Sequence, residues 1–201
     1  AMTVQEMIML SVLLIKLVAA LCLIVFGKPM QKYARWVAMA ASLASLVLFI
    51  TYIPILQKGT NIPINFNYMP AIGIQLSLNI DWLSFPFLLT EEFVTIIAIV
   101  FALGYIPRDE KNHLFYALLL FFSVGMSGTT LANDIFLFYF FWELMLIASA
   151  FLIVNWGEGE RRTATALKYF IITHLGSLIV LVAFIIVYAQ SGVDHFSMLW
   201  K

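Results

Sequence analysis

Residues 134–157, DIFLFYFFWELMLIASAFLIVNWG, are apolar over a length that suits one membrane-spanning helix. A hydrocarbon core of about 30 Å needs roughly 20 helical residues. One carboxylate, Glu143, lies about nine residues into this helix, which at 1.5 Å per residue places it roughly 13 Å deep. A charge near the middle of a bilayer is costly, so Glu143 needs a partner or a function.

The composition of the whole chain also indicates a bilayer environment. Hydrophobic residues make up 63% of the chain and charged residues 11%, with a mean hydropathy of +1.00, whereas about a quarter of the residues of soluble domains are charged. Basic and acidic side chains balance at 11 each, which argues against a nucleic-acid partner or a polybasic lipid anchor. The single cysteine, Cys22, excludes an internal disulfide.

Turn-forming and charged residues divide the chain into six runs long enough to cross a membrane. The predicted helices cover residues 7–26, 34–53, 82–105, 113–131, 135–154 and 163–188. Residues 54–81 contain three prolines and the alternating stretch GIQLSLNID, which predicts a short extramembrane hairpin or extended loop. We therefore predict an all-α polytopic membrane protein whose residues 1–201 form a single transmembrane domain.

The placement of lysine and arginine predicts the orientation. Short loops rich in these residues tend to stay in the cytoplasm. The first, third and fifth loops hold most of them, whereas the opposite side holds Lys58 and Lys201. Both termini are therefore expected outside, in a cell membrane or another energy-transducing membrane. The first run is too long for a signal peptide and contains Lys16, so we expect a mature helix there.

Two successive segments carry a more specific pattern, LANDIFLFYFFWELMLIASAFLIVNWG and ATALKYFIITHLGSLIVLVAFIIVY. The first helix enters through Asn-Asp, holds the triplet Phe-Trp-Glu at residues 141–143 and leaves through Trp-Gly, and Ala-Leu-Lys-Tyr-Phe at residues 166–170 opens the next helix. This combination resembles the antiporter-like subunits shared by respiratory complex I, Mrp-type sodium/proton antiporters and energy-converting membrane-bound hydrogenases. The resemblance covers about residues 80–190.

The resemblance implies the N-terminal part of an antiporter-like fold, with Glu143 as the family's key glutamate and Lys168 as its lysine on the following helix. It also implies translocation of protons, sodium ions or both by a non-redox subunit of a multisubunit energy-converting complex. The partners would be other membrane subunits, including further antiporter-like ones. Because relatives continue into a second, inverted repeat, we expect either a naturally short subunit or the N-terminal piece of a longer chain.

Lys168 lies five residues into its helix, roughly 8 Å deep, so it could approach Glu143 directly or through one water. Desolvation favours a neutral acid and a nearby ammonium favours the carboxylate, so a moving lysine could load or release a proton. Two alternatives stay open. Glu143 could be a structural link between helices, and the chain could be a truncated paralogue that acts in assembly without transport, with Ala148 and Ala150 open to partner helices.

His174 is a candidate relay residue, and it stands where some quinone-reductase relatives carry arginine. Ser177 stands where some carry aspartate. A histidine titrates near pH 6.5 and suits proton transfer, but a histidine bonded to a hydroxyl at a helix contact is equally common.

Glu91, Glu92 and Lys16 form a candidate second polar site, because the two acids lie mid-helix where relatives are usually apolar. Adjacent helical residues point about 100° apart, so we expect that the two acids do not share one partner. Lys16 lies at a similar depth in the first helix. We predict that one acid lies near Lys16 or a neighbouring subunit, and that neither acid faces lipid.

The sequence contains no motif for a cofactor. It has no Cys-x-x-Cys, no glycine-rich phosphate loop and no pair of histidines at ligand spacing, so we predict no metal, haem, iron–sulfur or nucleotide site. The segment around Glu91 supplies too few oxygens for a sodium site. A stand-alone enzyme is disfavoured, since no nucleophile–base arrangement is present. A non-redox subunit of an oxidoreductase or antiporter complex is expected instead.

Overall fold

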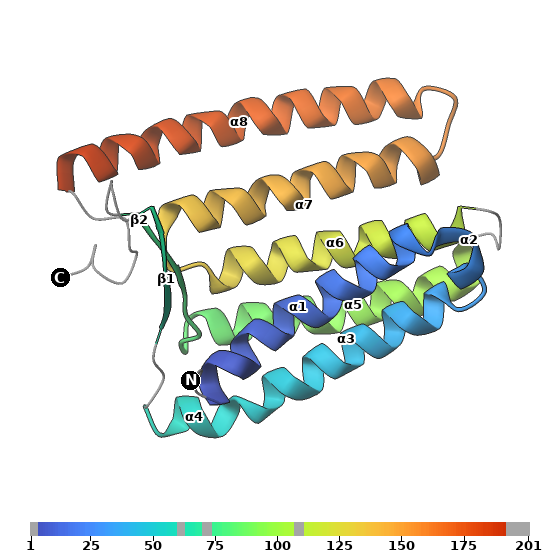
Figure 1. Cartoon of the computed structure of the whole chain (residues 1–201). Coiled ribbons are helices and arrows are strands. Elements are labelled where there is room, and N and C mark those ends of the chain that lie inside the picture. Colours follow the sequence, from blue (N-terminus) through green and yellow to red (C-terminus); the bar gives the residue numbers. More distant parts are fainter. Residues whose placement is uncertain (1–3, 60–62, 70–73, 107–110, 192–201) are drawn as a thin grey trace.

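The protein is a bundle of long helices, shown by a computed structural model that describes residues 4–59, 63–69, 74–106 and 111–191 (Figure 1). Within these residues, six helical segments are long and apolar enough to cross a membrane. They are α1 (Val4–Val25), α3 (Ala34–Thr51) continued by α4 (Ile53–Gln57), α5 (Ser84–Tyr105), α6 (Asn112–Leu131), α7 (Ile135–Trp156) and α8 (Arg162–Ser191). This confirms the prediction of an all-α polytopic membrane fold.

The second predicted helix extends beyond its expected end. Residues 54–57 were expected in the loop 54–81 because Pro54 follows the apolar run, but they belong to α4. Pro54 lies in the first turn of that helix, where its missing N–H needs no intrahelical partner. A further single turn, α2 (Gly27–Met30), follows α1.

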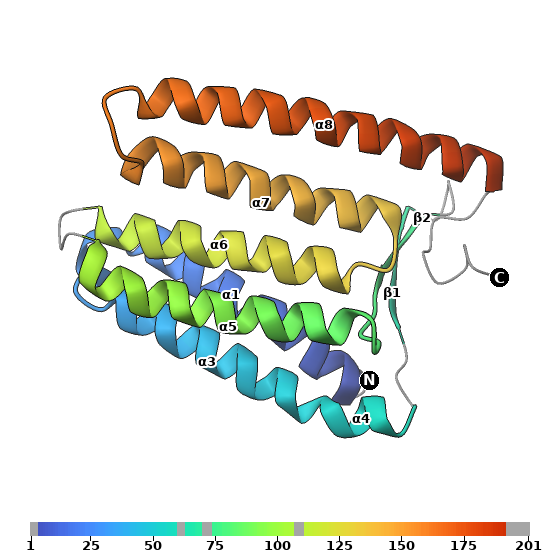
Figure 2. The same cartoon turned by 180° about the vertical axis from the view of Figure 1, so that it is seen from behind.

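The helices form two unequal groups (Figures 1 and 2). Helices α1, α3, α5 and α6 pack against one another, whereas α7 packs on α6 and α8 lies outside α7. The start of α1, the end of α8 and the strands lie at one end of the bundle, and α2 lies at the other. The first group therefore has an interior, whereas α8 is covered on one side only.

The predicted hairpin is present. Strands β1 (Ile64–Met69) and β2 (Ile74–Leu78) pair in antiparallel register, with an irregularity between Asn67 and Met69. The hairpin is fastened to the junction of α6 and α7. Asn133 N donates to Ser77 O at 2.8 Å, and Ser77 N donates to Asp134 Oδ2 at 2.7 Å.

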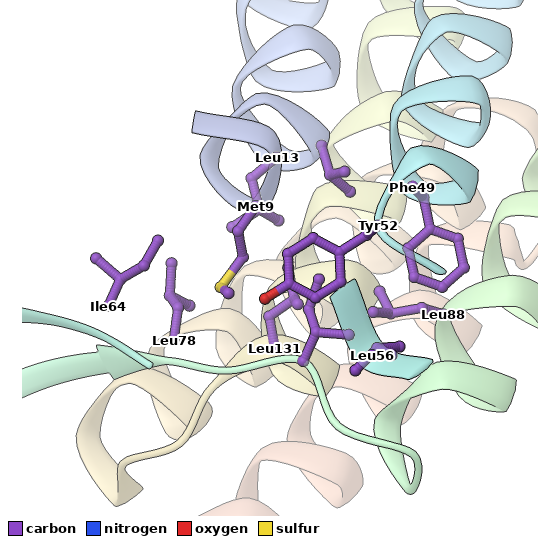
Figure 3. Packing of buried hydrophobic residues seen from close by; sticks show 11 residues of the cluster. Met9, Leu13, Phe49, Tyr52, Leu56, Ile64, Leu78, Leu88 and Leu131 are labelled. Carbon is purple, nitrogen blue, oxygen red and sulfur yellow. The ribbon is translucent and has the colours of Figure 1, made fainter. Parts of the chain in front are cut away.

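Buried apolar side chains gather in two clusters, one near each end of the first helix group. Figure 3 shows the cluster on the hairpin side, which includes Met9, Phe49, Tyr52, Leu88 and Leu131. The other cluster includes Ala20, Leu23, Ala38, Ile99, Tyr116 and Leu120. On each of α1, α3, α5 and α6, a short segment separates the residues of one cluster from those of the other. Those four segments carry the polar groups described next.

Candidate functional site

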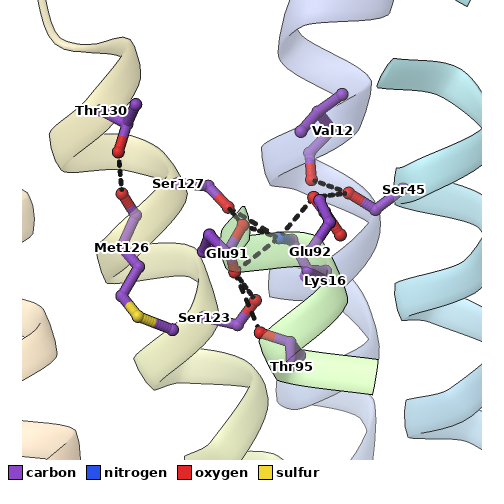
Figure 4. Close-up of polar contacts among 10 residues, drawn as sticks. All are labelled: Val12, Lys16, Ser45, Glu91, Glu92, Thr95, Ser123, Met126, Ser127 and Thr130. Atoms are coloured by element: carbon purple, nitrogen blue, oxygen red, sulfur yellow. Dashed lines mark hydrogen bonds and ion pairs between the residues drawn. The ribbon is translucent and has the colours of Figure 1, made fainter. Parts of the chain in front are cut away.

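The four intervening segments form a buried polar layer around Lys16 (Figure 4). The ammonium of Lys16 lies 2.8 Å from Glu92 Oε1 and 3.2 Å from Glu91 Oε2. Lys16 and Glu92 are fully buried and Glu91 is 6% exposed. The prediction that an acid lies near Lys16 and that neither acid faces lipid is thus confirmed.

The expectation that Glu91 and Glu92 do not share one partner is wrong. Both acids bond the same ammonium, and Lys16 Nζ also donates to Ser127 Oγ at 2.6 Å. The expectation relied on the angle of about 100° between adjacent residues of a helix, as if each side chain pointed straight out from the axis. A lysine ammonium on a four-carbon stem can enter between two diverging carboxylates, and it carries three donors.

Hydroxyl groups from two other helices complete the polar layer. Ser123 Oγ donates to Glu91 Oε1 at 2.5 Å and Ser127 Oγ donates to Glu91 Oε2 at 2.7 Å. Thr95, one turn beyond Glu91, adds a bond at 3.1 Å. From α3, Ser45 Oγ lies 2.6 Å from Glu92 Oε1. Each long side chain is thus held by neighbours on several helices.

Sequence reasoning missed Ser45, Ser123 and Ser127. The spacing of Ser123 and Ser127, four residues apart in an otherwise apolar helix, places both on one face and was a usable signal. Nothing along the chain indicated that this face meets Glu91, since the contact joins residues 32 and 36 positions apart.

The second polar site joins α7 and α8 through Glu143. Its Oε2 lies 2.9 Å from Nδ1 of His174, and its Oε1 accepts from Ser177 Oγ at 2.6 Å. Tyr139, one turn before Glu143, also interacts with Glu143 and Ser177. The Glu143 side chain is 17% exposed and that of His174 is 37% exposed. The site is therefore open on one side, unlike the layer around Lys16.

Lys168 is exposed on α8, six residues before His174. Among the residues that the structure describes, no ion pair or hydrogen bond of Lys168 is present, so the structure does not bring Lys168 and Glu143 into contact. At 1.5 Å per residue, Lys168 lies about 9 Å from His174 along the helix axis. The immediate partners of Glu143 are the histidine and the serine.

Small residues fit α7 closely against α6. A Cβ atom added at Gly125 would lie 2.7 Å from Met145 Cβ, and one added at Gly128 would collide with the ring of Phe141. Ala148 is buried within the chain, so the surface that was expected to be open to partner helices there is already covered. On the other side of α7, Ser149 Oγ lies 2.9 Å from Tyr169 Oη of α8.

Comparisons with known proteins agree with the fold and with the pattern around Glu143. Residues 132–201 match the family model described as "NADH:quinone oxidoreductase/Mrp antiporter, TM". Proteins named "Putative antiporter subunit mnhA2" are 33% identical over 168 residues in Staphylococcus epidermidis and 28% identical over 192 residues in Staphylococcus aureus. These alignments cover 83% and 95% of this chain. They cover only 21% and 24% of the relatives, so the chain spans less than a quarter of their length.

Two solved structures share the fold. The structure of the Mrp complex from Dietzia sp. DQ12-45-1b superposes with a TM-score of 0.82 at 23% identity, over 94% of this chain and 20% of that chain. The structure of the membrane-bound sulfane sulfur reductase, an archaeal respiratory membrane complex, superposes with a TM-score of 0.77 at 24% identity, over 92% of this chain and 28% of that chain.

Proposed function

Because this chain belongs to the antiporter-like membrane subunit family of NADH:quinone oxidoreductases and Mrp antiporters, we propose that it translocates protons, sodium ions or both within a multisubunit membrane complex. Glu143 is the central protonatable group. His174 is the nearest relay group, and Lys168 modulates the charge of the site from a greater distance.

The contact of Glu143 with His174 and Ser177 carries this proposal. A neutral imidazole nitrogen can accept or donate according to its tautomer, and a hydroxyl can do both. Glu143 can therefore gain or lose a proton while both contacts persist, because the single carboxyl proton requires only one of the two contacts to reverse its direction. The partial exposure of Glu143 and His174 supports proton entry from outside the helix pair.

Lys168 fits a modulating role because its charge is not neutralised by a partner within the described part of the chain. An ammonium favours the ionised form of a nearby carboxylate and disfavours it when it withdraws. In a medium of low dielectric constant, charges interact over longer distances than in water. A change in the position of Lys168 would alter the proton affinity of Glu143 and His174 together.

The same proposal includes orientation and partners. Lys28, Lys32 and Arg35 lie near the end of the bundle opposite the hairpin, together with Arg161 and Arg162, and this end is proposed to be cytoplasmic. The hairpin and the N-terminus would then lie outside. Helix α8, which is apolar and covered mainly by α7, offers a side for further membrane subunits or lipid.

The test is the variant Glu143→Gln in the full complex, reconstituted in vesicles with a pH-sensitive and a sodium-sensitive dye. Glutamine keeps the size of the side chain and its acceptor oxygen but cannot exchange a proton. Ion transport should fall to the level of vesicles without the complex. The matched control is Glu160→Gln, which changes an exposed carboxylate in the α7–α8 connection and should transport normally.

Normal transport by an assembled Glu143→Gln complex would refute the role of Glu143. That result would instead favour the alternative that the chain is a structural or assembly subunit. Comparing the two dyes identifies the transported ion, because proton and sodium movements are recorded separately.

A further inference from the structure

We propose that the polar layer around Lys16 is a proton-binding site that holds one proton on Glu92 while Glu91 is ionised and paired with Lys16. This inference does not rest on transport through Glu143. It concerns a different set of helices, α1, α3, α5 and α6, and a site that is closed from the surface.

The charges of the layer require an additional proton or cation. Lys16 contributes one positive charge, whereas two ionised glutamates would contribute two negative charges. All three side chains are buried or nearly so, with exposures of 0%, 6% and 0% for Lys16, Glu91 and Glu92. An uncompensated charge in such a place is strongly disfavoured, and a carboxyl group then takes up a proton instead.

The hydrogen-bond donors around the two acids identify which one is ionised. Glu91 accepts from Lys16, Thr95, Ser123 and Ser127, with both oxygens engaged. Bonds donated to a carboxylate stabilise its charged form. Glu92 accepts fewer hydrogen bonds than Glu91. Its Oε1 contacts Lys16 and Ser45, whereas its Oε2 is buried and has no hydrogen-bond partner within the described residues. Glu91 is therefore the anion.

The single proton of Ser45 supports a protonated Glu92. Ser45 Oγ lies 3.1 Å from Val12 O, which can only accept, and 2.6 Å from Glu92 Oε1. The hydroxyl cannot donate to both oxygens. If Glu92 Oε1 carries a proton, it donates to Ser45 Oγ, and Ser45 donates to Val12 O. The lone pair left on Oε1 accepts from Lys16, so each contact has one donor.

The unpartnered Oε2 then belongs to a neutral carbonyl group. Leaving a buried neutral oxygen without a donor costs less free energy than leaving a charged oxygen without one. A sodium ion between the two acids would be the other way to balance the charge, but that space is occupied by the ammonium of Lys16. The geometry thus favours a proton.

Infrared spectroscopy of the purified full-length protein in lipid tests this inference. A protonated carboxyl group has a C=O stretching band separate from that of a carboxylate, and the band shifts in D₂O once the proton exchanges. At neutral pH we expect Glu92→Gln to remove band intensity equal to one carboxylic acid per chain. Glu160→Gln, which changes an exposed acid, should leave the band unchanged.

A second variant allows a decision even if Glu92→Gln does not fold. Glu143→Gln removes the intramembrane acid that lies outside the layer around Lys16, so a remaining buried carboxylic acid at neutral pH is expected in its spectrum. Loss of all such intensity in Glu143→Gln, or an unchanged band in folded Glu92→Gln, would overturn the proposal. So would a band that disappears when sodium chloride replaces choline chloride, because sodium would then occupy the site in place of the proton.

Discussion

The layer around Lys16 and the site around Glu143 place carboxylates within the same bundle under opposite conditions. In the first, acids and an ammonium are enclosed by four helices, with the Lys16 nitrogen 2.8 and 3.2 Å from the nearest carboxyl oxygens. In the second, one acid lies between two helices, bonds a histidine and a serine, and keeps 17% of its side-chain surface exposed. Only the second has an open side and a histidine partner, whose ring nitrogen can either donate or accept.

The difference suggests that the layer around Lys16 keeps its charges fixed, whereas the site around Glu143 can exchange a proton. Breaking a buried ion pair leaves an uncompensated charge, so the first site resists change and holds helices together. The partners of Glu143 can reverse donor and acceptor roles, so its protonation state can change at low structural cost.

Replacing Lys16 should have the largest effect on stability. In Lys16→Met the ionised Glu91 loses its counter-charge inside the bundle, and breaking a buried pair in this way typically costs about 3–5 kcal/mol. Thermal unfolding of the purified full-length protein measures the loss. Lys28→Met, at an exposed position, is the matched control and should change little. The double variant Lys16→Met/Glu91→Gln should recover part of the lost stability. Equal stability of Lys16→Met and Lys28→Met would show that the layer around Lys16 does not hold the helices together.

Adding a methyl group at Gly128 should come next. Its Cβ would meet the Phe141 ring, so Gly128→Ala must push α6 and α7 apart. Such overpacking typically costs about 1–3 kcal/mol. Gly176→Ala is the control on α8, where no atom lies within 4 Å of the new Cβ. Thermal unfolding of both variants compares the packed contact between α6 and α7 with an open position on α8. An equal response would show that the contact between α6 and α7 tolerates the added methyl group.

Removing the carboxylate of Asp134 should have an intermediate effect. Asp134 caps α7 by accepting from Leu137 N at 2.8 Å, and it accepts from Ser77 N of the hairpin at 2.7 Å. Loss of a helix cap costs about 0.5–2 kcal/mol. In Asp134→Ala, amide hydrogen exchange should accelerate at Leu137 and Ser77 while the layer around Lys16 stays protected. Faster exchange throughout the bundle would mean that the cap supports both sites.

Replacing Glu143 should change stability least while it changes transport most. Glutamine retains an acceptor for Ser177, so Glu143→Gln loses at most about one ordinary hydrogen bond, roughly 0.5–1.5 kcal/mol. Thermal unfolding compared with Lys16→Met measures the difference. A loss as large as that of Lys16→Met would indicate that Glu143 is a structural lock, as the layer around Lys16 is.

The membrane class, the number of spanning helices and the hairpin could be predicted from the sequence, because length, hydropathy and turn residues act locally. Glu143 could be singled out as an intramembrane acid for the same reason. Its partners could not be predicted in this way. Helix α7 is apolar on all sides, so no hydrophobic stripe shows which face meets α6 and which meets α8.

The charged residues that lie in the membrane can be identified from the sequence alone, because a charged residue inside an apolar run of about 20 residues enters the bilayer with its helix. Which of these charges come into contact depends on the tertiary structure. It brought Lys16 between Glu91 and Glu92, surrounded them with serines from α3 and α6, and placed His174 and Ser177, rather than Lys168, against Glu143. The reason is physical. Contacts between helices depend on the rotation and tilt of each helix, and close packing against all neighbours sets these together.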